Sequence, residues 1–145
     1  IEIALKFALE GREGKPIGTV FLLGDMEELK PVARPLILNP CKGHPKKTRS
    51  IHASEFVETM REFAALDGGF LIDRKGTVEQ AGVYLDAPVT KKVKVQKGLG
   101  SRHVAAAAAT AQSNALAIVI SESSGSVTVF SKGAEVLSLS RPTRT

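Results

Sequence analysis

The sequence predicts a mixed α/β fold, in which a twisted central sheet of about six or seven strands is flanked by helices. An amphipathic helical pattern opens the chain, another ends before its midpoint, and an alanine-rich helix interrupts a series of short apolar segments with strand character. No repeat or low-complexity linker divides the 145 residues. We therefore expect residues 1–145 to form one domain with a sizeable buried core.

The first half of the chain predicts two helices and a strand. Ile1–Glu10 has apolar residues at helical spacing and stops at Gly11. Ile17–Leu23 is a short apolar run rich in β-forming residues, which predicts a buried strand. Ser54 is the predicted N-cap of a helix over Glu55–Leu66, whose apolar residues share one face.

The remaining segments predict loops and further strands. Met26–Arg49 holds four prolines and much charge, so we expect irregular structure with one short strand near Leu36–Leu38. After the second helix, turn-forming residues separate short apolar runs. These runs predict strands at Gly69–Ile72, Thr77–Ala81, Lys92–Val95, Ala115–Ile120, Val127–Phe130 and Glu135–Leu139.

The run GLGSRHVAAAAAT, Gly98–Thr110, predicts a helix whose start suits an anion. Ser101 is the predicted N-cap, and the alanines that follow have the highest helix propensity. Arg102 and His103 then fall in the first turn, where the helix dipole disfavours a cation by about 0.3–1 kcal/mol and favours an anion similarly. Glycines before the cap, among them Gly100, let a ligand approach the backbone N–H groups. A bound phosphate and a plain exposed polar helix start explain this stretch equally well.

Asp67 lies in LDGGFLID, between a predicted helix and a predicted strand. On its own it is most simply a turn residue. However, Gly68 and Gly69 let the backbone lie against a flat ligand, and the carboxylate offers hard oxygens to Mg²⁺ or Mn²⁺. If Asp67 and the Arg102–His103 pair converge, the site suits phosphoryl or nucleotidyl transfer, in which metal and cationic groups stabilise charge on the reacting phosphate.

Two further segments place polar or aromatic side chains near predicted strand ends. Tyr84, in AGVYLDA, is the only tyrosine, and the chain has no tryptophan. Its ring is suited to stacking on a base, although burial in a core is the commoner fate of such a residue. Ser121 and Glu122 end a predicted strand at a turn, where they either face a cleft or form a plain hairpin turn.

The net charge of +5 is concentrated in Lys42–Arg49 and Lys91–Lys97. Such patches attract polyanions, including nucleic acid and nucleotides. Aromatic residues make up only 5% of the chain and neither patch contains one to stack on a base, so solvated surfaces are favoured over a nucleic-acid interface.

Cysteine content and hydropathy indicate the compartment. The single cysteine, Cys41, excludes an internal disulfide and fits a reducing environment, and with His44 and His52 it makes a poor zinc site. No apolar stretch approaches the roughly 20 residues that cross a bilayer, and no signal peptide opens the chain, so we expect a cytoplasmic protein without a membrane partner. The chain opens at Ile1 without a methionine, which fits a segment cut from a longer protein.

Four segments, in this order, resemble the diadenylate cyclase (DAC) domain family, which joins two ATP molecules into cyclic di-AMP. They are LDGGFLID, AGVYLDA, GLGSRHVAAAAAT and AIVISESSGSVTVF. KPIGTVFLLGD also resembles the strand that begins this domain in archaeal-type members. The resemblance covers most of the chain, densely from Phe56 to Leu139, and implies the fold of that domain.

The resemblance also implies roles for particular residues. Asp67 would bind Mg²⁺ or Mn²⁺ and help activate the ribose 3′-hydroxyl, with Arg102 and His103 as the other catalytic residues. Tyr84 and Leu85 would flank the adenine, and the helix start would hold the phosphates. The implied ATP-binding residues are Gly68, Gly69, Tyr84, Leu85, Gly100, Ser101, Arg102, His103, Ser121 and Glu122.

Three positions depart from the family pattern. Gly69 replaces the usual alanine, which we expect to be a mild change. Val104 stands where a second motif arginine is usual, and Ser123 replaces the second glutamate of the turn. These departures indicate either variation within a branch of the family or a module that binds ATP or cyclic di-AMP without chemistry.

The implied mechanism uses two subunits face to face, each holding one ATP and one divalent metal ion. Each 3′-hydroxyl would attack the partner's α-phosphorus, and two displacements would expel two pyrophosphates, with positioning and electrostatics supplying most of the catalysis. Self-association as a symmetric dimer, at least transient, is then a requirement of the chemistry. A silent nucleotide-binding module is the main alternative, and a nucleic-acid-binding domain that uses the basic stretches is less favoured.

Overall fold

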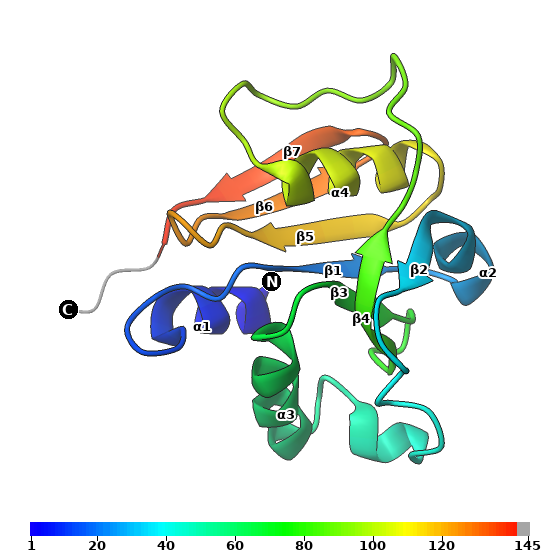
Figure 1. Ribbon diagram of the computed structural model, residues 1–145, viewed down its shortest axis with the longest axis vertical. Helices are drawn as coiled ribbons and strands as arrows, with labels where there is room; N and C mark the ends of the chain where they lie inside the picture. The colour runs from blue at the N-terminus through cyan, green and yellow to red at the C-terminus, as the bar shows by residue number, and fades with distance from the viewer. Residues whose placement is uncertain (142–145) are drawn as a thin grey trace.

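The computed structural model describes residues 1–141, which form one seven-stranded mixed sheet with helices on both faces (Figure 1). The sheet order is β2-β4-β3-β1-β5-β6-β7, and only the central β1–β3 pair is parallel. This confirms the predicted fold class. The strands are β1 (Thr19–Leu23), β2 (Ala33–Pro35), β3 (Gly69–Ile72), β4 (Val78–Leu85), β5 (Leu116–Ile120), β6 (Val127–Ser131) and β7 (Ala134–Leu139).

Four α-helices cover the sheet in the described part of the chain. They are α1 (Glu2–Glu10), α2 (Met26–Leu29), α3 (Ser54–Ala64) and α4 (Ser101–Ala111), with 3₁₀ turns at Lys30–Val32 and Lys46–Arg49. None of these helices has the length and apolar character needed to cross a bilayer. The predicted helices over the first ten residues and over the alanine-rich run are both confirmed.

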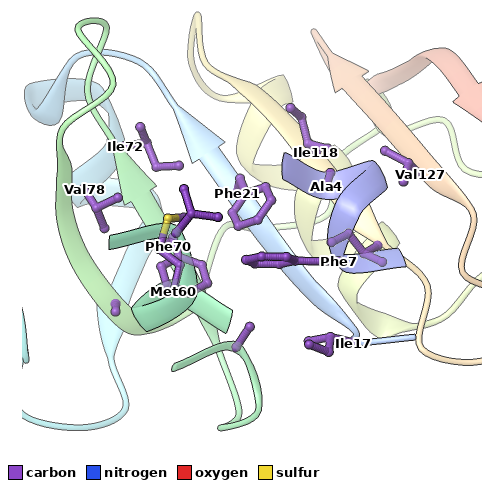
Figure 2. Close-up of a cluster of buried hydrophobic side chains, with 14 of the residues drawn as sticks. Ala4, Phe7, Ile17, Phe21, Met60, Phe70, Ile72, Val78, Ile118 and Val127 are labelled. Atoms are coloured by element: carbon purple, nitrogen blue, oxygen red, sulfur yellow. The ribbon is translucent and has the colours of Figure 1, made fainter. Parts of the chain in front are cut away.

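The apolar run of β1 is buried on both faces because its side chains alternate between two cores. Phe21 enters the core beneath α1 and α3, where its ring centroid lies 6.1 Å from that of Phe7 and 5.5 Å from that of Phe70 (Figure 2). Val20 and Leu22 enter the core beneath α2 and α4. The central position of β1 therefore explains its continuous hydrophobicity.

The alanines of α4 let the helix lie close to the sheet. Ala106, Ala107 and Ala109 are fully buried in the second core. At the end of the helix, the buried Thr110 hydroxyl accepts a hydrogen bond from the Gly133 N–H at 3.2 Å and donates one to the Ala107 carbonyl. These contacts attach α4 to the β6–β7 turn and fix the direction in which its N-terminus points.

Both predicted N-caps are wrong by one residue. Ser54 and Ser101 are the first residues of their helices, and neither caps its helix through its hydroxyl. The cap positions belong to Ala53 and Gly100, which take the extended backbone conformation that precedes a helix. Arg102 nevertheless stays in the first turn of α4.

The segment Met26–Arg49 is more ordered than predicted. It begins with the short helix α2, which the sequence analysis missed. Its strand is β2 rather than Leu36–Leu38, because Arg34 pairs with Tyr84 of β4 and the pairing ends soon after, at the hydrogen bond from the Leu36 N–H to the Gly82 carbonyl. The predicted strand at Leu36–Leu38 is therefore displaced towards the N-terminus.

Two later strand predictions also need correction. β4 runs to Leu85, beyond the predicted Thr77–Ala81, because it pairs with both β3 and β2. Lys92–Val95 forms no strand and makes only an isolated bridge from Lys94 to Ala134. Its side chains do alternate as expected, with the valines packed against the second core and the lysines exposed.

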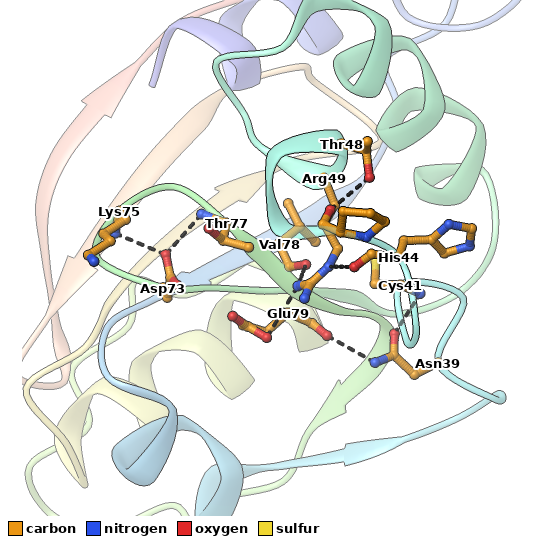
Figure 3. Close-up of polar contacts among 11 residues, drawn as sticks. Asn39, Cys41, His44, Thr48, Arg49, Asp73, Lys75, Thr77, Val78 and Glu79 are labelled. Carbon is orange, nitrogen blue, oxygen red and sulfur yellow. Dashed lines mark hydrogen bonds and ion pairs between the residues drawn. The ribbon is translucent and has the colours of Figure 1, made fainter.

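A polar network holds the loop after β2 against β4 (Figure 3). Arg49 donates hydrogen bonds to the carbonyls of His44 and Val78, both at 2.9 Å, and pairs with the Glu79 carboxylate at 3.2 Å. The Asn39 side chain donates to the Glu79 carbonyl at 2.9 Å. The Pro-rich loop is therefore fixed, and with it the segment that leads from β2.

Candidate functional site

A cavity of about 400 Å³, called here the main cavity, lies where the start of β3, the end of β4 and the start of α4 meet. Asp67 and Arg102 both line it, although they come from different elements. The structure thus brings together the carboxylate and the helix start that the sequence singled out. The lining residues are Val20, Leu36, Asp67, Gly68, Val83, Tyr84, Leu85, Ser101, Arg102 and Ala105.

The turn that presents Asp67 depends on glycine. Gly68 has a φ of +102°, and a Cβ there would lie 2.8 Å from the Val83 carbonyl oxygen, so a side chain is excluded by both conformation and space. The Thr19 hydroxyl donates a hydrogen bond to the Gly68 carbonyl at 3.1 Å. Because β1 and β4 both contact this turn, the backbone that carries the exposed Asp67 side chain is held in place.

Gly69 does not line the main cavity. It is buried at the start of β3, where a Cβ would lie 2.5 Å from both the carbonyl oxygen and Cγ1 of Val20. In this structure the position needs glycine, since an alanine there would require β1 to shift. Gly69 therefore permits a close approach between the strands β3 and β1, and not between the backbone and a ligand.

The start of α4 offers free backbone donors. The N–H groups of His103 and Val104 both donate to the Gly100 carbonyl, at 3.1 and 3.3 Å. Those of Ser101 and Arg102 have no backbone acceptor within residues 1–141 and are available to an anion. The Gly100 position is open within residues 1–141, because an added Cβ would have no atom within 4 Å beyond Gly100 and its two chain neighbours. This geometry suits a phosphate group.

A smaller cavity of about 240 Å³ adjoins the main cavity and shares Ser101 and Arg102 with it. Gly100, Ser121 and Glu122 also line the smaller cavity. Among the predicted site residues, the two cavities therefore gather all except the strand glycine Gly69 on one surface around the start of α4.

Burial of His103 disfavours a positive charge on its ring. His103 is only 4% exposed, and its ring lies edge-on to that of Phe130 with the centroids 6.2 Å apart. Burial lowers the pKa of the imidazole below its ordinary value of 6.5, with an opposing effect from Glu135 and a smaller lowering effect from Arg102. Burial thus weakens the predicted conflict between a positive charge and the helix dipole at His103, and the conflict remains at Arg102.

The His103 ring also has a buried nitrogen without a partner. Nε2 makes no hydrogen bond within residues 1–141. A buried polar atom of this kind costs free energy unless a group outside the described chain satisfies it. His103 lines the smaller cavity, so a ligand there has access to this part of the helix start.

Tyr84 is not a core residue. Its side chain is 47% exposed at the main cavity, whereas the neighbouring Leu85 is 5% exposed. An aromatic face beside apolar Leu85 and Leu36 fits a flat heterocycle such as a purine. Of the two interpretations that the sequence left open for this tyrosine, burial in the core is excluded.

The turn after β5 satisfies its own polar groups. The Ser121 N–H donates to the Ser126 carbonyl at 2.9 Å, and the Gly125 N–H donates to the Ser121 carbonyl at 2.8 Å. The hydroxyl of Ser123, at the position where a second glutamate is usual, lies 3.1 Å from the Ser121 hydroxyl. Glu122 is thus the acidic side chain that this turn presents to the smaller cavity.

The structure adds residues that the sequence analysis missed. Val20, Leu36 and Ala105 line the main cavity. The available signal for Leu36 was the apolar run that it begins within a charged, Pro-rich segment. Within residues 1–141, no group of three or more His, Cys, Asp or Glu side chains could hold a metal ion.

Comparison with known protein families shows to which family this chain belongs. The DAC family, described as DisA bacterial checkpoint controller nucleotide-binding, matches residues 6–135. The chain belongs to the DAC family. This confirms the resemblance that the four sequence segments indicated.

Two curated relatives of this DAC chain are named diadenylate cyclase. The protein from Methanocaldococcus jannaschii is 40% identical over 133 residues, which are 92% of this chain and 41% of that protein. The protein from Haloferax volcanii is 37% identical over 139 residues, which are 95% of this chain and 50% of that protein. The chain therefore spans half or less of the length of these relatives.

Solved structures with the same fold include two bacterial proteins. One is described as a hypothetical membrane spanning protein from Bacillus cereus and has a TM-score of 0.63 at 23% identity. The match covers 92% of this DAC chain and 59% of the Bacillus cereus chain. The other, a double mutant of DacA from Staphylococcus aureus, has a TM-score of 0.61 at 19% identity. That match covers 98% of this chain and 83% of the DacA chain. At these identities the likeness shows the fold.

Proposed function

We propose that residues 1–145 form a single diadenylate cyclase domain, which condenses two ATP molecules into cyclic di-AMP and two pyrophosphates. Membership of the DAC family and the names of the two archaeal relatives support this proposal. The observation that supports it most directly is that Asp67 and Arg102 line the same cavity. A carboxylate in the same cavity as a phosphate-binding helix start is suited to nucleotidyl transfer.

One ATP molecule would occupy the main cavity of each subunit. The volume of about 400 Å³ lies within the range of small-molecule sites. The adenine would lie against Tyr84 and Leu85, and the phosphates would accept hydrogen bonds from the N–H groups of Ser101 and Arg102. The Arg102 guanidinium would stabilise the negative charge that builds on the reacting phosphate.

Asp67 is the residue that would hold a divalent cation. A single carboxylate cannot form a closed protein site, but Mg²⁺ is commonly bound through one or two carboxylates together with substrate phosphates and water. The donor set therefore fits a cation that arrives with ATP. When bound, Mg²⁺ or Mn²⁺ would neutralise phosphate charge and lower the pKa of a coordinated hydroxyl.

The reaction needs two subunits with their main cavities face to face. Each ribose 3′-oxygen would form a bond to the α-phosphorus of the partner's ATP, while the bond from that phosphorus to the oxygen bridging the α- and β-phosphates breaks and pyrophosphate leaves. The 3′-hydroxyl proton would pass to the Asp67 carboxylate. Because each subunit positions its own nucleotide, the attack becomes effectively intramolecular.

Exposed apolar side chains beside the main cavity support self-association. Leu36 and Ile37 are each 42% exposed, and Leu38 is 95% exposed. Leu36 itself lines the main cavity. A contiguous apolar patch at a site is typical of an interaction surface.

The central experiment is incubation with ATP and Mn²⁺ followed by mass spectrometry. Wild-type protein should form cyclic di-AMP, and Asp67→Asn should abolish turnover while leaving the thermal unfolding midpoint within about 2 °C of the wild type, because the side chain is exposed. Glu27→Gln, an exposed carboxylate on α2 outside both cavities, should retain full activity. Turnover by Asp67→Asn at the wild-type rate would remove the role assigned to this residue.

A silent nucleotide-binding module is the second candidate function. Val104 and Ser123 favour it, since each replaces a charged residue usual in the family motifs. Calorimetry that shows ATP or cyclic di-AMP binding, without product on chromatography, would select this candidate. A nucleic-acid-binding role is weaker, because Arg49 of the first basic patch is only 12% exposed and pairs with Glu79. Steeply salt-dependent DNA affinity retained in Arg102→Ala would support it.

A further inference from the structure

Arg34 and Tyr84 form a contact that the proposed chemistry does not use. They are directly opposite each other on the antiparallel strands β2 and β4. The Arg34 guanidinium carbon lies 4.7 Å from the centroid of the Tyr84 ring. This is the geometry of a cation–π contact. The Arg34 Nε also lies 3.4 Å from a carboxylate oxygen of Asp86, which follows β4.

This group contributes little to the stability of the fold. The Arg34 and Asp86 side chains are 56% and 62% exposed, and ion pairs at such sites have small net energies. The two strands are already joined by the β2–β4 pairing and by the hydrogen bond from the Asp86 N–H to the Val32 carbonyl. The contact therefore calls for an explanation other than strand pairing.

The position of the main cavity supplies that explanation. Tyr84 lines this cavity and Arg34 does not. The guanidinium lies over one face of a ring that is 47% exposed, so part of the ring surface remains open to a ligand. An aromatic ring with a cation on one face can still receive a flat ligand on the other.

We propose that Arg34 is a positioning residue, which holds the Tyr84 ring in the orientation that receives the purine base, and that Asp86 in turn holds Arg34. This proposal rests on the proposed function, since it assumes a purine nucleotide in the main cavity. An exposed tyrosine that is already fixed loses less rotational freedom when a base stacks on it. The planar guanidinium is suited to this role, whereas a lysine ammonium would cover the ring less completely.

Tyrosine fluorescence tests the contact directly. Tyr84 is the only tyrosine in a chain without tryptophan, so intrinsic emission reports on this ring alone. Arg34→Met should change the emission of the ligand-free protein. Arg12→Met is the matched control, because Arg12 is also an exposed arginine in an ion pair, with Glu62, and does not line the main cavity. This variant should leave the emission unchanged.

Binding of two ligands separates positioning from simple attraction of phosphate. Adenosine and ATP are each titrated into wild type, Arg34→Met and Arg34→Lys. Positioning predicts that Arg34→Met raises the Kd of both ligands by the same factor, about two- to fivefold, with partial rescue in Arg34→Lys. A loss confined to ATP would show that Arg34 acts only as a charge and would overturn the proposal.

A double-mutant cycle gives the deciding result. In a Tyr84→Leu background, Arg34→Met should have no further effect on either Kd, because the ring that Arg34 holds is gone. An undiminished effect in that background would overturn the proposal. In steady-state assays Arg34→Met should raise KM for ATP and leave kcat within about twofold of the wild type.

The two proposals fail in different ways. If wild type forms cyclic di-AMP but Arg34→Met binds adenosine as tightly as wild type, the role of Arg34 is wrong and the cyclase function stands. If adenosine binding shows the Arg34–Tyr84 coupling but no cyclic di-AMP forms, the positioning role stands and the cyclase function is wrong. If wild type binds neither ligand, both are wrong.

Discussion

The Arg102 guanidinium lies 3.6 Å from the Glu122 carboxylate, and the pair passes over Gly18. A Cβ at Gly18 would lie 2.9 Å from the Arg102 guanidinium and 2.6 Å from the Glu122 Cβ. The residue before β1 is therefore part of the site, because only glycine leaves room for this ion pair. Arg102 reaches both cavities from this position.

Gly18→Ala should separate Arg102 from Glu122 and lower the free energy of unfolding by about 1–3 kcal/mol, the usual cost of overpacking. ATP binding should weaken as Arg102 moves. Urea denaturation and calorimetry measure the two effects. Glu122→Gln is the control, since it keeps the side-chain volume and removes a largely exposed ion pair, so the loss of stability should stay under about 1 kcal/mol. Equal stability of Gly18→Ala and wild type would contradict the steric argument.

Gly100→Ala should separate ligand binding from folding. The position is open, and its φ of −79° is accessible to alanine, so the unfolding free energy should change by less than about 0.5 kcal/mol. The added methyl group would stand beside the free N–H groups at the start of α4, and the Kd for ATP should rise about tenfold or more. Calorimetry of ATP binding checks this, and an unchanged Kd would show that the phosphates bind elsewhere.

His103 should make stability depend on pH. Burial lowers the pKa of this imidazole in the folded protein below the value of 6.5, so the unfolded chain binds more protons in the interval between the two values. The free energy of unfolding should therefore fall as the pH drops from about 6.5 towards the folded pKa, and be independent of this group at higher pH.

Denaturation of wild type and His103→Gln between pH 5 and 8, a range of about three units, isolates this contribution. The variant should lose the part of the pH dependence that His103 supplies. His44→Gln, at an exposed histidine in the loop after β2, is the matched control for the loss of an imidazole. The same acid-induced loss in wild type and His103→Gln would show that another group is responsible.

The sequence predicted the parts of the fold that local pattern determines. β1 and the alanine-rich helix carry strong local signals, a short apolar run and high helix propensity, and both are found where expected. The prediction of a strand at Lys92–Val95 was wrong. Alternation of valine and lysine indicates that alternate side chains are buried, but it does not indicate that the segment pairs with another strand. β2 was misplaced because its position depends on β4, which is distant in the sequence.

The site shows the same division between local and distant information. Asp67 and the start of α4 were identified from motifs and the structure brings them together. Gly69 was expected to lie along a ligand, but the approach of Val20 from β1, which no local pattern encodes, explains this glycine. The charge of His103 likewise depends on burial against Phe130 of β6, which the first turn of a helix does not reveal.

Arg49→Met should destabilise the protein by about 2–4 kcal/mol, because it removes one partner of a largely buried ion pair and leaves backbone carbonyls without their donor. Arg12→Met removes an exposed pair with Glu62 and should cost less than about 1 kcal/mol. Urea denaturation of both variants provides the comparison. Similar losses for the two would show that the network around Glu79 does not stabilise the fold.

Leu38→Glu should weaken self-association without altering the subunit. Leu38 is 95% exposed, so a charge there should change the unfolding free energy by less than about 0.5 kcal/mol. In a face-to-face dimer, however, the carboxylate would be buried against its symmetry mate, and the rate of cyclic di-AMP formation per subunit should fall most steeply at low protein concentration.

Val136→Glu is the matched variant for this test. Val136 lies on β7, at the opposite edge of the sheet from β2, and is 59% exposed. It should behave as wild type in both sedimentation and rate, since the proposed interface is built around Leu36–Leu38. If Leu38→Glu sediments and turns over as wild type at every concentration, these leucines are not part of the contact. If Val136→Glu alone disrupts association, the subunits meet through the β7 edge instead, and the main cavities cannot face each other.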